Sequence, residues 1–305
     1  MEILEVYKIW DKAVHNAFTD LIWFNNSWYC TFREGDNHVC DEGKIRIICS
    51  KDTKEWKSVA LIKFPNGDLR DPKLSITKDN KLVLNAAARL IQPINGNKHQ
   101  SLTWISTDGI DFDKPFTCTT GLGTWRWRIT IKDDLAYSIA YGGKDIQGCL
   151  YSSKDCKSWE IVKNKIYPDV ESFGNESSLV FLENGDAYTL LRRDKASCTA
   201  MLGFSKPPYT TWEWSDLKVR IGGPKMITIP NEKCFLAGVR LNDKRLRTSL
   251  CWIDPEMSKI TEVLTLPSGG DTSYTGLVYR EGFLWVSYYS SHEGKTAIYF
   301  AKIKI

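Results

Sequence analysis

The fold is decided by the stretch Ser50-Lys-Asp-Thr-Lys-Glu-Trp56, which has two further copies in this chain. It recurs as Ser106-Thr-Asp-Gly-Ile-Asp-Phe112 and as Ser153-Lys-Asp-Cys-Lys-Ser-Trp159, at spacings of 56 and 47 residues. Each copy has Ser first, Asp third and an aromatic residue seventh, and each follows a short apolar run. The Ser and Asp side chains can accept hydrogen bonds from turn amides, while the aromatic packs between neighbouring repeats. Repeats of this length are typical of one four-stranded propeller blade each.

The rest of the 305-residue chain fits the same architecture. Short β-rich runs alternate with Gly, Asn and Asp turns, and no long amphipathic helix is apparent. A weaker copy of the repeat lies at residues 205–212, a fifth blade ends near residues 252–254, and the first strand, residues 4–9, can complete the last blade. We therefore predict an all-β fold, a six-bladed β-propeller of four-stranded antiparallel blades that forms one domain over residues 1–305. A pair of β-sandwiches is the alternative.

Composition restricts the classes of partner. The net charge is +4 and the basic residues are dispersed, which argues against a nucleic-acid partner. No apolar run reaches membrane-spanning length. Nine scattered cysteines without a Cys-x-x-Cys pair indicate a reducing compartment such as the cytoplasm, and we expect no metal and no cofactor. No signal peptide is visible at the first residue, although a chain that starts at a mature end would look the same.

Two predicted hairpins in the second half carry polar residues at the ends of their strands. Glu176 opens one strand, and Arg192 lies on the return strand after the turn at residues 183–185. A glycine-rich turn then delivers Asp271 and Tyr274 to a hairpin whose turn lies at residues 280–282. Side chains at such positions are often presented to a ligand.

This order of residues resembles the second half of the sialidases and their relatives. In that family a glutamate opens a strand, an arginine lies on its hairpin partner, and a second arginine opens a later strand before the segment with the nucleophilic tyrosine. The matching positions here are Glu176, Arg192, Arg247 and Tyr274. The repeat likewise resembles the structural Asp box (BNR repeat) of sialidase-type propellers, one residue shorter than the common form.

The resemblance implies an exo-acting glycoside hydrolase that releases a terminal acidic, sialic-acid-like sugar from a glycan. Tyr274 would be the nucleophile and Glu176 its base, because a phenol with a pKa near 10 needs a partner to take its proton. A separate aspartate would act as acid/base. Asp71 is our assignment, with Asp36 and Asp41 as competitors.

Arginines are expected to hold the sugar carboxylate, since their forked guanidinium groups bind carboxylates bidentately. A propeller gathers the inner strand ends of all blades at one axis, so polar residues at those ends are predicted to bind substrate. They are Arg33, His38, Arg70, Arg128, Arg192, Arg240, Arg247 and Asp271. Arg128 is preferred to Arg126, which alternates with tryptophans and is expected to be solvated, and Arg193 must point away from Arg192.

The chain departs from the family at its start. The family has an arginine in an Arg-Ile-Pro segment, whereas the corresponding run here is His15-Asn-Ala-Phe-Thr-Asp20. No arginine precedes Arg33, so either the family's set of three arginines is incomplete here or Arg33 substitutes. Two alternatives therefore stay open: a non-catalytic glycan-binding propeller, and a lyase or inverting hydrolase with Asp71 or His38 as acid or base.

Overall fold

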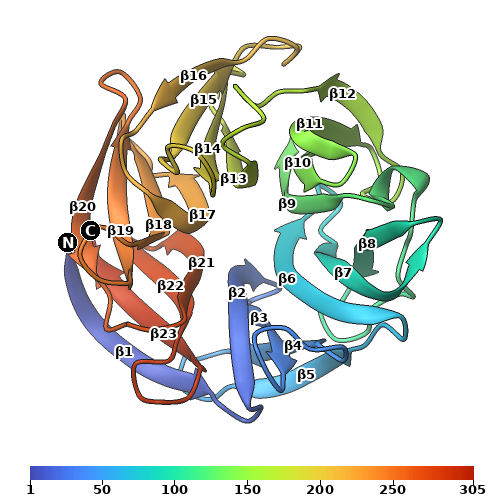
Figure 1. The fold of residues 1–305 in the computed structure, drawn as a ribbon. Helices are drawn as coiled ribbons and strands as arrows, with labels where there is room; N and C mark the ends of the chain where they lie inside the picture. Colours follow the sequence, from blue (N-terminus) through green and yellow to red (C-terminus); the bar gives the residue numbers. More distant parts are fainter.

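The computed structural model describes residues 1–305, which form six antiparallel sheets arranged as blades around one axis (Figure 1). Blade one contains β2 (His15–Phe24), β3 (Ser27–Gly35), β4 (Lys44–Ser50) and β5 (Lys57–Ile62). Blade two contains β6 (Gly67–Ile76), β7 (Leu82–Ile94) and β8 (Asn97–Ser106). Blade three contains β9 (Trp125–Lys132), β10 (Leu135–Gly142), β11 (Asp145–Ser153) and β12 (Glu160–Asn164).

The second half of the ring repeats this order of strands. Blade four contains β13 (Gly174–Phe181), β14 (Ala187–Arg193), β15 (Met201–Ser205) and β16 (Glu213–Asp216). Blade five contains β17 (Ile221–Thr228), β18 (Phe235–Leu241), β19 (Arg247–Asp254) and β20 (Lys259–Thr265). Blade six contains β21 (Thr272–Arg280), β22 (Phe283–Ser290), β23 (Ala297–Lys304) and, from the start of the chain, β1 (Glu2–Trp10).

The ring is closed by the two ends of the chain. Strand β1 pairs with β23 in an antiparallel ladder from Glu2↔Lys304 to Trp10↔Ile298, so the termini lie side by side (Figure 1). The prediction that the first strand completes the last blade is confirmed. The β-sandwich alternative is wrong, because all six sheets belong to one ring.

Blade two differs from the prediction of four strands in every blade. Its sheet has three strands, and the segment that follows β8 adds no fourth strand but forms the isolated bridges Thr103↔Phe116 and Gln100↔Leu122. Pro115 interrupts this segment, and a proline has no amide hydrogen to donate to a ladder. A 3-10 turn, Thr119–Gly121, follows and leads the chain toward blade three.

The three repeats form the turns that their sequences predict. In the first, the Asp52 carboxylate accepts the amides of Lys54 and Glu55 at 2.9 Å, and Ser50 Oγ accepts the amide of Thr53 at 2.9 Å. Asp108 and Asp155 accept two turn amides each in the same way. The terminal aromatics pack toward the preceding blade; Trp56, for example, lies 5.2 Å from Phe300 of β23. These turns therefore have a structural role.

The nine cysteines are free thiols, and four of them are buried. The structure contains no helix long and apolar enough to cross a membrane.

Every innermost strand carries a bulge at the same level of the propeller. In β2, β6, β9, β13, β17 and β21, two residues of the strand oppose one residue of its neighbour. The first extra residues of these bulges are Phe18, Asp71, Trp127, Asn175, Gly223 and Tyr274. Bulges re-aim side chains and recur beside active sites. This ring of bulges positions the residues described next.

Candidate active site

Three predicted residues, Tyr274, Glu176 and Arg192, meet near the propeller axis. The hydroxyl of Tyr274 donates to Oε1 of Glu176 at 2.5 Å. Nη1 of Arg192 lies 2.9 Å from the same carboxylate oxygen and donates to the Tyr274 hydroxyl at 3.3 Å. Glu176 and Tyr274 are 5% and 8% exposed. The contacts join blade four to blade six, which no local sequence pattern specifies.

Tyr274 is held in place by its backbone and by surrounding rings. It occupies the bulge of β21 with a φ of 51°, an unusual conformation for a bulky residue. Its ring lies 5.0 Å from that of Phe18 and 5.9 Å from those of Trp127 and Tyr289. Because strained backbone persists only where the surroundings over-determine it, this packing fixes the direction of the hydroxyl.

Gly223, in the bulge of β17, completes the environment of Glu176. Its amide donates to Oε2 of Glu176 at 2.8 Å, so both carboxylate oxygens have partners. Its φ is +56°, and a Cβ there would lie 2.8 Å from Cδ2 of Tyr274. Only glycine fits at this position without displacing the tyrosine.

Burial and charge give the pair opposite protonation states. Burial, reinforced by the charge of Glu176, raises the pKa of Tyr274 well above 10. Burial alone would raise the pKa of Glu176, but the charge of Arg192 and the hydrogen bonds from Tyr274 and Arg192 lower it below 4.5. The resting site therefore holds a neutral phenol against a carboxylate, and Glu176 is the base in contact with that phenol.

Asp71 lies in the equivalent bulge of β6, with a φ of 52°. It is 7% exposed, and its Oδ1 has no hydrogen-bond partner. Burial raises its pKa above 3.8, against the charges of Lys73 and Arg70 and with the help of Glu176. A buried carboxyl group with a raised pKa is suited to proton transfer. The competing aspartates lie elsewhere: Asp36 is exposed, and Asp41 pairs with Arg89 at 2.9 Å on the surface.

Arg240 and Arg192 line a cavity of about 380 Å³ next to Tyr274. The guanidinium of Arg240 lies 6.0 Å from the Tyr274 ring centroid. Its one hydrogen bond runs from Nη1 to the Thr272 carbonyl at 3.5 Å, and it makes no ion pair with a carboxylate. Asp271 lines the same cavity. Arg240 is therefore the cationic group of the site with the greatest free capacity for an anion.

Arg70 and Arg33 share one buried carboxylate, Asp68. Arg33 is fully buried, and its Nε donates to Asp68 at 2.7 Å, so it links blade one to blade two and has no free face for substrate. Arg70 lies 3.2 Å from Asp68 and donates to the His38 carbonyl at 2.6 Å, with its guanidinium 4.8 Å from the Phe18 ring. Arg70 therefore borders the cluster, whereas the substitution of Arg33 for the family's first arginine finds no support in this geometry.

Arg247, a predicted clamp residue, lies outside the cluster. Its guanidinium is held by Glu262 at 2.8 and 2.7 Å and by Asp243 at 2.6 Å. The strand position that it occupies resembles the family's, but two carboxylates of its own blade saturate its donors. We conclude that Arg247 stabilises blade five.

Arg128 and Arg126 also differ from expectation. Arg128 pairs with the buried Asp20 at 2.6 Å, and Lys225 reaches the same carboxylate at 3.0 Å. Arg128 and Lys225 line a separate hollow, which shares no lining residue with the cavity of Arg240. Arg126 was expected to be solvated, but it is 3% exposed, with its guanidinium 4.6 Å from the Trp159 ring.

Arg193 points away from the site as predicted and pairs with Asp216 at 3.3 Å.

His38 and Asp271 lie together beside the cavity, and His15 joins them. Nδ1 of His38 and Nε2 of His15 lie 2.9 and 3.0 Å from Oδ2 of Asp271. The other carboxylate oxygen accepts the hydroxyl of Tyr289 at 2.7 Å. Burial would raise the pKa of Asp271, but the hydrogen bonds from His15, His38 and Tyr289 lower it far below 3.8.

Sequence reasoning missed several residues of the site. Lys73 is 1% exposed and lies 4.8 and 5.6 Å from the rings of Trp127 and Tyr274, and burial lowers its pKa to about 8. His15 stands in the run that corresponds to the family's Arg-Ile-Pro segment, so its position was a usable signal. No local sequence pattern identified Lys73 or Gly223, because each contacts the site through residues on strands of other blades.

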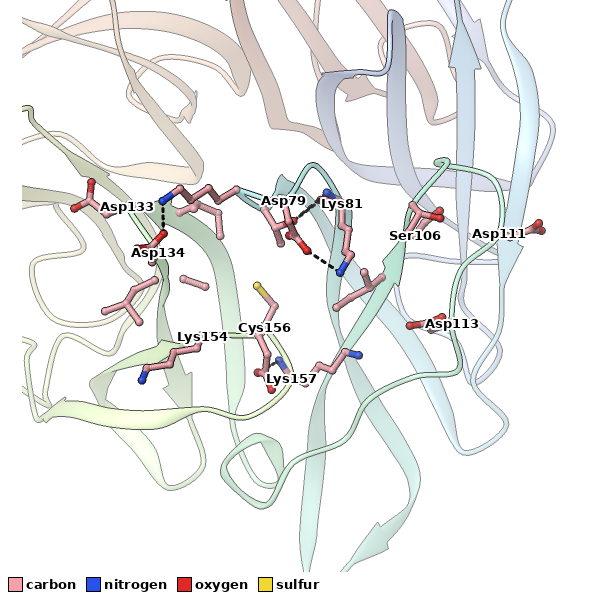
Figure 2. A pocket seen from close by; sticks show the side chains of 18 residues that line it. Asp79, Lys81, Ser106, Asp111, Asp113, Asp133, Asp134, Lys154, Cys156 and Lys157 are labelled. Atoms are coloured by element: carbon pink, nitrogen blue, oxygen red, sulfur yellow. Dashed lines mark hydrogen bonds and ion pairs between the residues drawn. The ribbon is translucent and has the colours of Figure 1, made fainter.

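A larger hollow of about 990 Å³ lies between blades two and three (Figure 2). Its rim carries exposed charges that are already paired, such as Lys78 with Asp134 and Lys81 with Asp79. None of the predicted site residues lines it. The cluster of Tyr274, Glu176 and Arg192 near the axis therefore remains the candidate site.

Comparisons with known proteins place the fold. No protein-family model and no curated protein matches the chain. Among solved structures, a protein of unknown function from Dyadobacter fermentans has a TM-score of 0.86 at 19% identity, with 100% of this chain and 99% of that chain covered. An α-L-arabinanase from Penicillium chrysogenum, complexed with arabinobiose, has a TM-score of 0.76 at 13% identity, with 100% and 99% covered.

A sialidase from Trypanosoma rangeli has a TM-score of 0.72 at 12% identity, with 95% of this chain and 55% of that chain covered. This chain has the propeller fold of the sialidases. It spans about half the length of the trypanosomal enzyme, and sequence identities this low establish the shared fold alone.

Proposed function

We propose that this chain is an exo-acting glycoside hydrolase that releases a terminal acidic sugar from a glycan. The observation that carries the proposal is the buried hydrogen bond from Tyr274 to Glu176, with Arg192 against both groups. A phenol and a carboxylate in contact form an activated nucleophile pair. The fold shared with sialidases and with an arabinanase supports the same class of chemistry.

The residues divide the reaction into two steps with opposite proton transfers. In the first, Oη of Tyr274 bonds to the anomeric carbon while its proton passes to Glu176, and Asp71 protonates the departing glycosidic oxygen as that bond breaks. In the second, the Asp71 carboxylate takes a proton from water, which attacks the anomeric carbon, and Glu176 returns its proton to the leaving tyrosine. Two displacements retain the anomeric configuration.

Recognition of an acidic sugar rests on the arginines of the cluster. Arg240 has no carboxylate partner, Arg192 lines the same cavity, and Arg70 packs on Phe18, whose ring contacts Tyr274. Arg192 and Arg70 already pair with Glu176 and Asp68, whereas Arg240 has no carboxylate, so a bound sugar carboxylate would lower the energy of the unpaired Arg240. The clamp proposed here is therefore Arg192, Arg240 and Arg70, without Arg247 and Arg33.

A second candidate is an inverting hydrolase or a lyase that uses Asp71 or His38. The raised pKa of the buried Asp71 and the His38–Asp271 contact at 2.9 Å favour it, because each supplies an acid or base independent of Tyr274. A glycan-binding propeller without turnover is the remaining alternative.

Aryl glycosides separate these functions. The panel contains 2-keto acid sugars, uronic acids, their carboxyl-reduced analogues and α-L-arabinofuranoside, with the configuration of the first product read by NMR. The proposal expects turnover of an acidic sugar with retention. Inversion or an unsaturated product would favour the second candidate, a preference for arabinoside would remove the acidic-sugar assignment, and saturable binding without product would indicate a binding propeller.

A further inference from the structure

We infer that His15, His38 and Asp271 form a binding site for one divalent transition-metal ion, at the seam between the first and last blades. The inference reverses our expectation of no metal. It stands on the geometry of these three side chains and does not depend on the proposed glycosidase activity.

The three potential ligand atoms already converge. Nε2 of His15 and Nδ1 of His38 lie 3.0 and 2.9 Å from Oδ2 of Asp271, and all three atoms lie within 4.8 Å of one another. Ligand atoms bound at about 2.0–2.2 Å to one ion are separated by roughly 3.0–3.5 Å from their neighbours. The exposed His38 ring needs only a small movement to bring all three atoms to one ion.

The carboxylate is oriented as a metal ligand usually is. Its second oxygen accepts the hydroxyl of the fully buried Tyr289 at 2.7 Å. The Asp271 amide donates to Ser291 Oγ at 2.9 Å, and its carbonyl accepts the Ser291 amide at 3.0 Å. Such outer hydrogen bonds fix a ligating carboxylate and increase metal affinity.

The ligand types select the class of ion. Two imidazoles and one carboxylate suit zinc, iron, manganese or cobalt in the divalent state, whereas calcium and magnesium prefer oxygen alone. Three protein ligands also leave coordination positions open. Asp271 lines the cavity that contains Arg240, so water or an anionic ligand in that cavity can complete the coordination.

The ion would also join the ends of the ring. His15 and His38 belong to blade one, and Asp271 precedes β21 of blade six. These blades meet where the closure of the propeller depends on β1. A ligand that binds only the folded ring stabilises it, so the thermal midpoint should rise by roughly 5 °C at saturation.

The test uses cobalt(II) and zinc(II) with the full chain after removal of metals by chelation. Nine free thiols are possible competitors, and cobalt distinguishes them because thiolate ligands give intense charge-transfer absorption. We expect one ion per chain without that absorption, together with a higher thermal midpoint. Affinity should fall at least about 100-fold in Asp271→Asn and in His38→Gln, and about tenfold in Tyr289→Phe.

The matched control is His99→Gln, because His99 packs against Trp125 away from this group and should leave binding unchanged. His38→Gln keeps the test valid if other variants unfold, since the His38 side chain is 50% exposed. Absence of saturable binding by the wild type, binding through thiolates, or wild-type affinity in His38→Gln would each overturn the inference.

Discussion

The hydroxyl of Tyr274 and the carboxylate of Glu176 are 2.5 Å apart in the folded chain although 98 residues separate them in sequence. Each lies in a bulge of an innermost strand, and Arg192 contacts both. The relationship depends on the ring of bulges, because a regular ladder would direct alternate side chains strictly up and down each blade.

Replacement of the nucleophile gives the first prediction. Tyr274→Phe should lower kcat at least about 1000-fold, because in the proposed mechanism the phenolic oxygen forms the bond to the sugar. The thermal midpoint should change little, since the ring keeps its contacts with Phe18 and Trp127 and Glu176 keeps Arg192. Steady-state kinetics and thermal unfolding measure the two effects. Wild-type turnover in this variant would end the assignment of the nucleophile.

The anion clamp gives the second prediction. Arg240→Lys should weaken binding of an acidic sugar by roughly tenfold to a hundredfold, because losing a charge-assisted fork costs about 1.5–3 kcal/mol. Lysine keeps the charge but cannot reproduce two parallel hydrogen bonds. Calorimetry with the sugar and its carboxyl-reduced analogue measures the effect, and only the acidic ligand should be affected.

Arg247→Lys is the matched control for the clamp. Its guanidinium is bound by Glu262 and Asp243, so the change should lower stability and leave sugar affinity unchanged. If Arg247→Lys weakened binding as much as Arg240→Lys, the arginines would act through the scaffold and the proposed clamp would be wrong.

The third prediction separates stability from activity at Asp71. Its pKa is raised in the fold, so the folded state binds this proton more tightly than the unfolded chain does. Stability therefore falls as pH rises from the unfolded pKa, about 3.9, through the folded value. Asp71→Asn has no carboxylate to ionise, so it removes this loss of stability, and asparagine tolerates the φ of 52°. At neutral pH the variant should therefore be more stable than the wild type by about 1 kcal/mol or more.

The same variant should lose the general acid. With a poor leaving group, turnover should fall about 10²–10⁴-fold, and with an activated aryl leaving group much less, because that group departs without a proton. Kinetics across a series of leaving groups and unfolding at several pH values measure both effects. An equal loss for all leaving groups would contradict an acid role for Asp71.

Gly223 provides the fourth prediction. Gly223→Ala should displace Tyr274, because the new Cβ would lie 2.8 Å from its ring and 3.0 Å from its amide. A shift of about 1 Å can cost about 100-fold in turnover, and the φ of +56° adds strain of roughly 1–3 kcal/mol. Gly282→Ala is the control, since φ is +79° there and a Cβ at that position would have no other atom within 4 Å. It should destabilise the protein without reducing turnover, and equal activities of the two variants would contradict the steric argument.

The fold could be predicted because its signals are local. Ser50 and Asp52 accept amides of one turn, and Trp56 donates to the Thr53 carbonyl of the same turn. Three copies of that turn indicate the length of a blade. The exception, blade two, shows the limit of a repeat argument. The spacing between repeats predicts how many residues a blade contains. It does not predict that the segment with Pro115 fails to form a fourth strand, since a proline has no amide hydrogen for the ladder.

The site could be predicted only in part. Tyr274, Glu176 and Arg192 were found because each stands at a strand end with a recognisable order. The carboxylates that bind an arginine could not be predicted, because they lie on other strands. Arg247 and Arg33 appeared free in sequence, yet Glu262 and Asp68 occupy their guanidinium groups. Conversely, Arg240 is available because the fold gives it no carboxylate.

Trapping of the covalent intermediate tests the central claim most directly. A fluorinated, activated 2-keto acid sugar slows the second step more than the first, so the glycosyl-enzyme should accumulate. Mass spectrometry of the intact chain and of its peptides should locate one sugar on Tyr274, and none in Tyr274→Phe. An adduct on Asp71 or Glu176, or turnover of the parent sugar with inversion and no adduct, would contradict the account.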